Sequence, residues 1–271
     1  MVFVKDACGI ICLIFTYLAI LYADYVVTRW IIMTIFVNSL WGPLNVFLFN
    51  TIIFLLIMSH LKAVFLDPGT VPLSSNRLDF SDLHSNQREL EKDEWTVCTR
   101  CENYRPPRAH HCRICKRCIK RLDHHCPWIN NCVGERNQKF FLQFLVYVAI
   151  TSIYSIILII ITWISDTDDS ITNEEAQQRM LHSVILLLES GLFGLFVIAI
   201  MIDQLHAILY DETPIEQLQM KGSYRPNRPK LALMAEVCGS RKSMLCWLFP
   251  CSSTNRRFDY EYDSNILNHD V

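Results

Sequence analysis

The chain has 271 residues, of which 51% are hydrophobic and only 19% are charged, a balance that excludes an ordinary soluble domain. The formal net charge of −2 says little by itself, because the charges are segregated along the chain rather than spread evenly. Segregated charge of this kind predicts a membrane topology.

Four apolar stretches approach or exceed the roughly 20 residues that a helix needs to cross a ~30 Å hydrocarbon core. They run from about residue 8 to 36, 46 to 64, 140 to 164 and 181 to 209. The first is far longer than the apolar core of a cleavable signal peptide, so it is predicted to be retained. The fold class predicted is an α-helical integral membrane protein with four transmembrane helices.

Turn-forming and acidic residues near or within the apolar stretches add detail to this prediction. A turn is expected at Gly42 and Pro43, before the second span. Asp24, Glu189 and Asp203 fall within spans, where charge is costly, and they are expected at interior or interfacial positions without a catalytic role.

Basic residues predict the orientation of the spans. Residues 77–139 contain 13 Lys and Arg, and the tail beyond residue 209 contains eight more. The loop 165–180 has only Arg179 as a basic residue, against five acidic residues. The positive-inside rule therefore places the large central loop and both termini in the cytosol. Cytosolic thiols stay reduced, which makes a disulfide framework an unlikely use of the cysteines.

Seven of the 12 cysteines fall between residues 98 and 132. Tetrahedral zinc takes four nitrogen or sulfur ligands, so two closed sites need eight. The potential ligands, in chain order, are Cys98, Cys101, His110 or His111, Cys112, Cys115, Cys118, His124 or His125, Cys126 and Cys132. Seven cysteines and two histidines supply nine ligands, which leaves one cysteine as a candidate nucleophile. Spacing alone does not select which cysteine or which histidines.

The run Asp123-His124-His125-Cys126, followed by Pro-Trp and Asn-Asn-Cys, resembles the signature of the DHHC family of protein S-acyltransferases. The resemblance extends to the four-span layout, to the Asp-Pro-Gly at 67–69 and to 213–216, where the family has its TTxE motif. The residues at 211–213 and the short tails are most similar to the Golgi-type subgroup. Two departures concern the tail: Pro214 and Ile215 stand inside the TTxE motif, and Leu233 replaces a usual asparagine.

The resemblance implies two structural zinc ions with interleaved ligands. One set is Cys98, Cys101, His111 and Cys118, and the other is Cys112, Cys115, His125 and Cys132. It implies that Cys126 is the spared thiol, which a long-chain acyl coenzyme A such as palmitoyl-CoA acylates and a cysteine of a substrate protein then deacylates. His124 would be the base in both steps, with Asp123 fixing its tautomer. Thr151 would line the closed end of an acyl cavity, where its small size admits longer chains.

The domain division predicted is residues 1–66 for spans one and two, 67–94 for a cytosolic connector, 95–138 for the double-zinc module, 139–210 for spans three and four, and 211–271 for a cytosolic tail. A Golgi or related endomembrane location is expected. Expected partners are substrate proteins, the lipid bilayer and a PDZ domain at the closing Asp270-Val271, but no nucleic acid.

Two alternatives stay open at this point: a noncatalytic zinc-containing membrane adaptor and a RING-like ubiquitin ligase. A RING ends in a second CxxC pair, whereas Cys126 and Cys132 have five residues between them, which disfavours it. Eight basic residues between 100 and 121 suit coenzyme A phosphates or anionic headgroups, or form a solvated face. Cys246 and Cys251 in the apolar tail are candidates for acylation.

Overall fold

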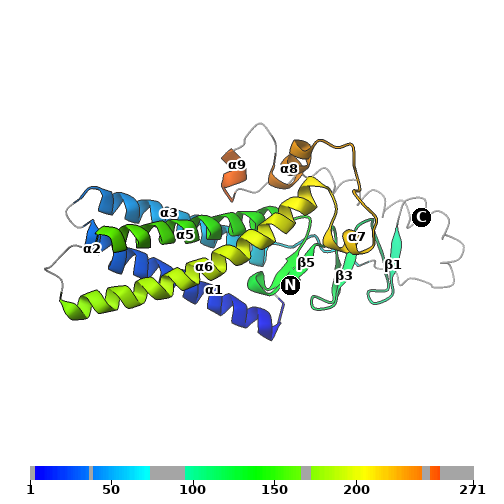
Figure 1. Ribbon diagram of the computed structural model, residues 1–271. Coiled ribbons are helices and arrows are strands. Elements are labelled where there is room, and N and C mark those ends of the chain that lie inside the picture. The colour runs from blue at the N-terminus through cyan, green and yellow to red at the C-terminus, as the bar shows by residue number, and fades with distance from the viewer. Residues whose placement is uncertain (1–3, 37–38, 74–94, 166–171, 240–244, 251–271) are drawn as a thin grey trace, which may run out of the picture.

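The computed structural model describes residues 4–36, 39–73, 95–165, 172–239 and 245–250. Within these residues, four helices are long and apolar enough to span a membrane (Figure 1). The first, Ala7–Ile35, consists of α1 (Ala7–Tyr25), a π-helical segment η1 (Val26–Ile32) and α2 (Met33–Ile35). The others are α3 (Trp41–Phe65), α5 (Gln138–Ser165) and α6 (Asn173–Leu209). The prediction of a four-span, multi-pass membrane protein is confirmed.

The helices bury small and apolar residues against one another and leave large apolar side chains uncovered. Phe49, Phe141, Ile159 and Leu186 are almost wholly buried between the spans, whereas residues such as Leu195 are mostly exposed. An outward apolar face has no place in water but suits a lipid environment, where lipid tails are as apolar as leucine. The outer faces of the bundle are therefore its lipid-facing surface.

The expected turn at Gly42 and Pro43 is wrong, because α3 already begins at Trp41 and contains both residues. Proline is tolerated in the first turn of a helix, where its missing N–H has no intrahelical partner. Glycine fits at position 42 because a Cβ there would lie 2.8 Å from the Phe36 carbonyl oxygen.

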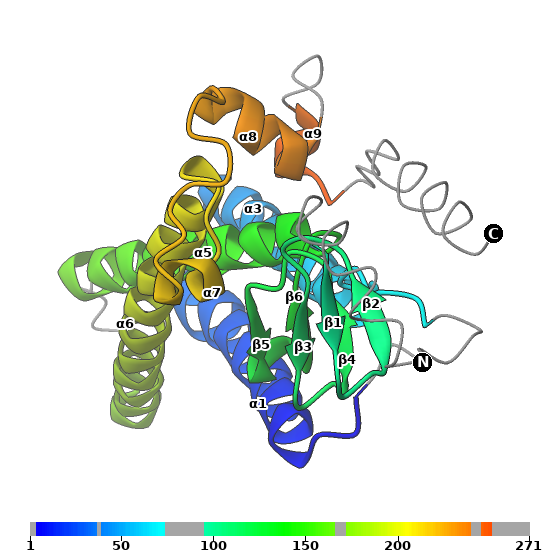
Figure 2. The same ribbon diagram turned by 90° about the vertical axis from the view of Figure 1, so that its right-hand side faces the viewer.

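The cysteine-rich segment folds as three short antiparallel hairpins at one end of the bundle (Figure 2). They are β1 (Thr96–Cys98) with β2 (Asn103–Arg105), β3 (His110–Cys112) with β4 (Arg117–Ile119), and β5 (His124–Cys126) with β6 (Asn131–Val133). A short 3₁₀ helix η2 (Pro127–Ile129) joins β5 to β6 and packs against α1. The third hairpin is thus in contact with the spans, through η2 against α1 and α3 and through β6 against α3.

The Asp-Pro-Gly turn after α3 connects the bundle to the hairpins. Asp67 accepts hydrogen bonds from the backbone N–H groups of Gly69 and Thr70, at 2.7 and 2.6 Å, which closes the turn. Gly69 adopts φ +108°, a conformation that favours glycine. The Gly69 carbonyl then accepts from Lys120, and Val71 donates to the Cys118 carbonyl. The turn therefore fixes the second hairpin relative to the membrane.

The tail after α6 contains α7 (Pro214–Leu218), α8 (Lys230–Cys238) and α9 (Leu245–Leu248). Thr213 and Glu216 form a reciprocal capping box on α7, and Pro214 occupies its first turn. The departure at Pro214 therefore preserves the local structure. Leu233 is buried in α8. Asp270, Val271 and Cys251 lie outside the described residues, as does the side chain of Cys246.

A buried ion-pair network joins the tail to Arg108, in the connection between the first and second hairpins. The Arg108 guanidinium binds Glu216 and Asp211, each at 2.7 Å, and both carboxylates are almost fully buried. Burial alone would raise the pKa of both carboxyls. Hydrogen bonds from Arg225 and Arg108 instead lower the pKa of Asp211 below its ordinary range, and hydrogen bonds from Arg108 lower that of Glu216. Ionised, paired carboxylates are therefore part of the folded state.

Replacing Glu216 with glutamine is expected to destabilise the protein by about 3 kcal/mol, because it leaves a buried guanidinium partly unpaired. A carboxyl whose pKa is lower in the folded than in the unfolded protein stabilises the fold at pH values above its unfolded-state pKa. This stabilisation is lost as the pH falls through the folded-state pKa. Thermal unfolding in detergent from pH 7 down to pH 4 would therefore show a steeper loss in wild type than in Glu216→Gln. As a control, Arg228 is the exposed ion-pair partner of Glu236, and its replacement by glutamine should lower the free energy of unfolding by less than about 1 kcal/mol. Equal effects of the two variants would contradict the prediction.

Candidate active site and zinc sites

Two clusters of cysteine and histidine side chains lie in the hairpin module. Cys98, Cys101, His111 and Cys118 form one cluster, and Cys112, Cys115, His125 and Cys132 form the other. In each cluster the four ligand atoms all lie within 4.8 Å of one another. These are the two ligand sets that the family resemblance implied.

The hairpin geometry explains why the two sets interleave. Each set takes a CxxC pair from the end of one hairpin and a histidine–cysteine pair from the next. The register places His111 opposite Cys118 in the second hairpin and His125 opposite Cys132 in the third. The second hairpin therefore contributes ligands to both sites and couples them.

The donor atoms fit tetrahedral zinc. A regular tetrahedron with Zn–S bonds of ~2.3 Å has S···S edges of about 3.8 Å. The Cys101 and Cys118 sulfurs are 3.7 Å apart, and His111 Nδ1 lies 3.2 to 3.9 Å from the three sulfurs of its set. The distances from His125 Nδ1 to its three sulfurs are 3.3 to 3.9 Å. The two clusters fit two zinc ions.

Cys126 belongs to neither cluster and is buried at the end of β5. Successive side chains of a strand point to opposite faces, so His124 and Cys126 share one face and His125 takes the other. His125 accordingly joins the second metal cluster, while His124 and Cys126 are in neither cluster. The alternation of a three-residue strand thus separates the two histidines.

A hydrogen-bonded chain orients His124. Its Nδ1–H donates to Asp123 Oδ2 at 2.6 Å, and Gln204 Nε2 donates to the same carboxylate oxygen at 2.7 Å. Phe141 packs edge-on against the imidazole, with ring centroids 5.5 Å apart. Burial disfavours the imidazolium, but hydrogen bonds to Asp123 and Cys126 outweigh it and raise the pKa of His124 to about 9. This arrangement of carboxylate, imidazole and thiol suits nucleophilic catalysis.

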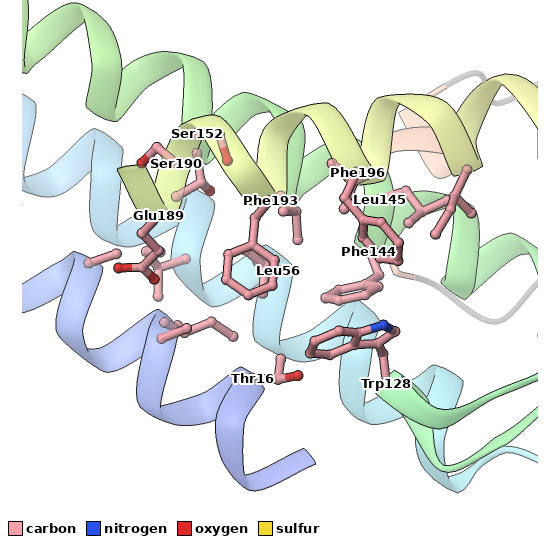
Figure 3. A pocket seen from close by; sticks show the side chains of 18 of the residues that line it. Thr16, Leu56, Trp128, Phe144, Leu145, Ser152, Glu189, Ser190, Phe193 and Phe196 are labelled. Atoms are coloured by element: carbon pink, nitrogen blue, oxygen red, sulfur yellow. The ribbon is translucent and has the colours of Figure 1, made fainter. Parts of the chain in front are cut away.

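Cys126 is one of the residues that line a cavity within the helix bundle. Figure 3 shows part of the lining of this cavity. All four spans line it: Thr16 and Ile20 belong to α1, Leu56 to α3, residues from Phe141 to Ser155 to α5, and residues from Glu189 to Ile200 to α6. Thr151, the predicted cavity residue, is in this lining. The lining is mainly apolar, so the cavity suits a hydrocarbon chain attached to the Cys126 sulfur.

Two residues that position the site were missed in the sequence. These residues are Gln204 and His60. His60 Nδ1 accepts a hydrogen bond from the Tyr17 hydroxyl at 2.9 Å, and His60 Nε2 donates to the Trp128 carbonyl at 3.0 Å. Both are buried polar residues inside apolar spans, a combination that is costly in hydrocarbon and marks functional positions. The presence of a costly polar residue within an apolar span was therefore the sequence signal by which both residues could have been recognised.

Of the eight basic residues between 100 and 121, Arg108 and Arg121 form ion pairs with Asp211 and so belong to the framework. Arg100, Arg113 and Lys116 are exposed. The charge of this segment is therefore divided between internal pairing and a solvated face.

The fold and site define a class of membrane protein in which a module with two zinc-binding clusters holds a buried cysteine thiol beside an apolar cavity. A model of the DHHC palmitoyltransferase family matches residues 91–221. Palmitoyltransferase ZDHHC7 of Rattus norvegicus is 37% identical over 253 residues, covering 92% of this chain and 80% of its own length. Palmitoyltransferase ZDHHC3 of Homo sapiens is 34% identical over 258 residues, covering 94% and 84%. The chain belongs to the DHHC palmitoyltransferase family.

A more distant plant relative covers most of the same region. Probable protein S-acyltransferase 12 of Arabidopsis thaliana is 30% identical over 219 residues, which is 78% of this chain and 74% of the relative. The similarity therefore extends through the spans as well as the cysteine-rich segment.

Proposed function

We propose that the protein transfers a long-chain fatty acyl group, such as palmitoyl, from coenzyme A to Cys126 and then to cysteine thiols of substrate proteins. The observation that carries this proposal is a thiol that lies outside both metal clusters, two residues from His124 on the same strand, and lines an apolar cavity. A noncatalytic adaptor or a ubiquitin ligase has no need of such a thiol and cavity. Membership of the DHHC palmitoyltransferase family supports the same reading.

In the first step, the Cys126 sulfur attacks the carbonyl carbon of the acyl thioester. The bond from that carbon to the coenzyme A sulfur breaks, and His124 passes the proton of the Cys126 thiol to the departing sulfur. In the second step, a substrate thiol attacks the same carbonyl carbon, and the bond from that carbon to the Cys126 sulfur breaks. His124 passes the proton of the substrate thiol to Cys126. One thioester replaces another, so the chain supplies positioning and water exclusion rather than driving force.

Asp123 and the zinc sites position these groups. Asp123 holds His124 by its Nδ1–H, which leaves the other ring nitrogen for the thiol. Zinc, when bound to His125 and Cys132, would pin β5 to β6 and so fix its neighbours His124 and Cys126. It supplies structural rigidity there and takes no part in the transfer.

The bundle provides an apolar environment for the chain. At about 0.8 kcal/mol for each buried CH₂, an acyl chain strongly prefers the cavity to water. The helix α5 advances about 21 Å from Phe141 to Ser155 at 1.5 Å per residue. An extended chain advances about 1.2 Å per bond, so this length accommodates about 17 carbons.

The location and boundaries are part of the proposal. The excess of basic residues in the central segment and the tail supports a cytosolic position for the zinc module and both termini. Similarity to the Golgi-type subgroup supports a Golgi or related endomembrane location. The proposed domain boundaries follow residues 66, 94, 138 and 210. The proposed cosubstrate is an acyl coenzyme A, and the proposed partner of the closing residues is a PDZ domain.

Replacing Cys126 with serine is expected to abolish labelling of the purified protein by a palmitoyl-CoA analogue. Wild-type labelling should be removed by hydroxylamine, because the label is held as a thioester. Mass spectrometry of the modified peptide locates it. Cys8, an exposed cysteine on α1, provides the matched control, and Cys8→Ser should keep the label.

Zinc content separates loss of the nucleophile from loss of the fold. Cys126→Ser should retain about two zinc ions per chain, because Cys126 is in neither ligand set. Unlabelled wild-type protein with both zinc ions would favour the adaptor, and labelling that survives in Cys126→Ser would place the nucleophile elsewhere.

A further inference from the structure

The two ends of the acyl cavity differ in chemistry. Near Cys126 the lining is aromatic, with Trp128, Phe141 and Phe144. Farther into the bundle, Glu189, Ser190 and Ser152 lie together (Figure 3). Thr151 and Ser155 also line the cavity. A cavity that binds only hydrocarbon has no use for a carboxyl and several hydroxyl groups at its far end.

Two of these polar groups have unmet hydrogen-bonding capacity. Thr151 Oγ1 and Ser155 Oγ are buried and have no hydrogen-bond partner among the described residues. Serine and threonine in helices commonly bond to the carbonyl four residues earlier, as Thr162 does with Leu158 at 2.7 Å. A buried polar atom without a partner is unfavourable, so these two hydroxyls point to a polar ligand group.

The depth of the polar end follows from two helices. Along α5, Thr151 and Ser155 lie 10 and 14 residues beyond Phe141, which contacts His124. At 1.5 Å per residue this is about 15 and 21 Å. Along the antiparallel α6, Glu189 precedes the active-site residue Gln204 by 15 residues, or about 22 Å. At about 1.2 Å per bond, these depths correspond to roughly the twelfth to the seventeenth carbon of an extended chain.

We propose that the far end of the cavity is a polar subsite that accepts a hydroxyl group carried near the methyl end of a fatty acyl chain. The carboxyl of Glu189 accepts from this hydroxyl, and the hydroxyls of Thr151 and Ser155 donate to it or accept from it. The ligand class is thus ω- or near-ω-hydroxylated acyl coenzyme A, in addition to plain acyl chains. The inference rests on acylation of Cys126 as proposed above.

The test is a competition between 16-hydroxypalmitoyl-CoA and palmitoyl-CoA on the purified full-length protein. Intact-protein mass spectrometry gives the ratio of the two acyl-enzymes after a single turnover. A hydrogen bond contributes on the order of a fivefold preference, so Glu189→Leu should lower the hydroxylated-to-plain ratio about fivefold. Glu189→Gln, which keeps a hydrogen-bonding side chain of similar size, should retain most of it. Thr151→Val and Ser155→Ala should lower the ratio by smaller factors.

Two controls test whether the effect depends on where the hydroxyl lies along the acyl chain and on whether the replaced residue lines the cavity. With 3-hydroxypalmitoyl-CoA, whose hydroxyl lies near the thioester, the ratio should be independent of Glu189. Thr162→Val makes the same replacement as Thr151→Val on the same helix but outside this cavity, and it should change nothing. An equal ratio in wild type and Glu189→Leu would overturn the polar subsite. Absence of any acyl-enzyme, even with palmitoyl-CoA, would instead overturn the proposed function.

Discussion

Replacing Cys132 with alanine is expected to remove one zinc ion per chain and to abolish formation of the acyl-enzyme. Cys132 is fully buried and faces His125 across the third hairpin, the one that carries Cys126. Structural zinc contributes about 10–16 kcal/mol in zinc-finger peptides, which is comparable with the whole stability of a domain. Ile129 and Val133 of this hairpin pack into the core of the bundle, but that packing does not supply the cross-link between β5 and β6 that zinc on His125 and Cys132 would. Metal analysis and single-turnover acylation by palmitoyl-CoA measure the two losses.

Cys238 offers a matched control, because it is equally buried but lies on α8 outside both ligand sets. Cys238→Ala should keep two zinc ions and form the acyl-enzyme. Cys98→Ala, in the first hairpin, should affect the distant site first and reduce acylation less. A Cys132→Ala protein with full zinc content and normal acylation would contradict the assignment of this ligand.

Some of the site could be predicted from the sequence because it depends on local chemistry. Counting ligands left one cysteine over, and the structure puts Cys126 outside both clusters. The alternation of side chains along a strand could also have separated His124 from His125, had the segment 124–126 been recognised as extended. Three-residue strands carry too few residues for a periodic signal.

The arrangement within the membrane was harder to predict. In a soluble helix, hydrophobic periodicity marks the buried face, but lipid and bundle interior are both apolar, so the signal vanishes. Glu189 was expected at an interior or interfacial position, yet nothing in the sequence placed it on the acyl cavity. Gln204 likewise became recognisable only when α6 was seen to pass beside Asp123.

The start of the second span shows a different limit. Gly42 and Pro43 are typical of turns, but both are also compatible with the first turn of a helix. The choice depends on close packing against the Phe36 carbonyl, a contact between segments that composition does not encode. Turn-forming residues therefore locate a span boundary only to within a few positions.

Replacing Asp123 with asparagine is expected to slow formation of the acyl-enzyme by up to about 10⁴-fold, the loss that the same replacement of the triad carboxylate causes in a serine protease. Asparagine fills the same space and can still accept a hydrogen bond from Gln204, so the fold and the zinc content should be unchanged. What is lost is the negative charge that stabilises the His124 imidazolium and fixes its tautomer. Rapid-quench measurement of acylation by palmitoyl-CoA gives the rate.

The neighbouring carboxylate Asp203 supplies the control, because it is exposed on the same helix as Gln204. Asp203→Asn should react at the wild-type rate. Gln204→Leu removes the donor that holds Asp123, at 2.7 Å, and the longer contact in which Gln204 accepts from Gln138, at 3.4 Å. It should lower kcat about tenfold with little change in KM, because it misplaces the carboxylate without removing its charge. A rate for Asp123→Asn within threefold of wild type would show that His124 works without a carboxylate, and the Asp–His–Cys arrangement would then be structural rather than catalytic.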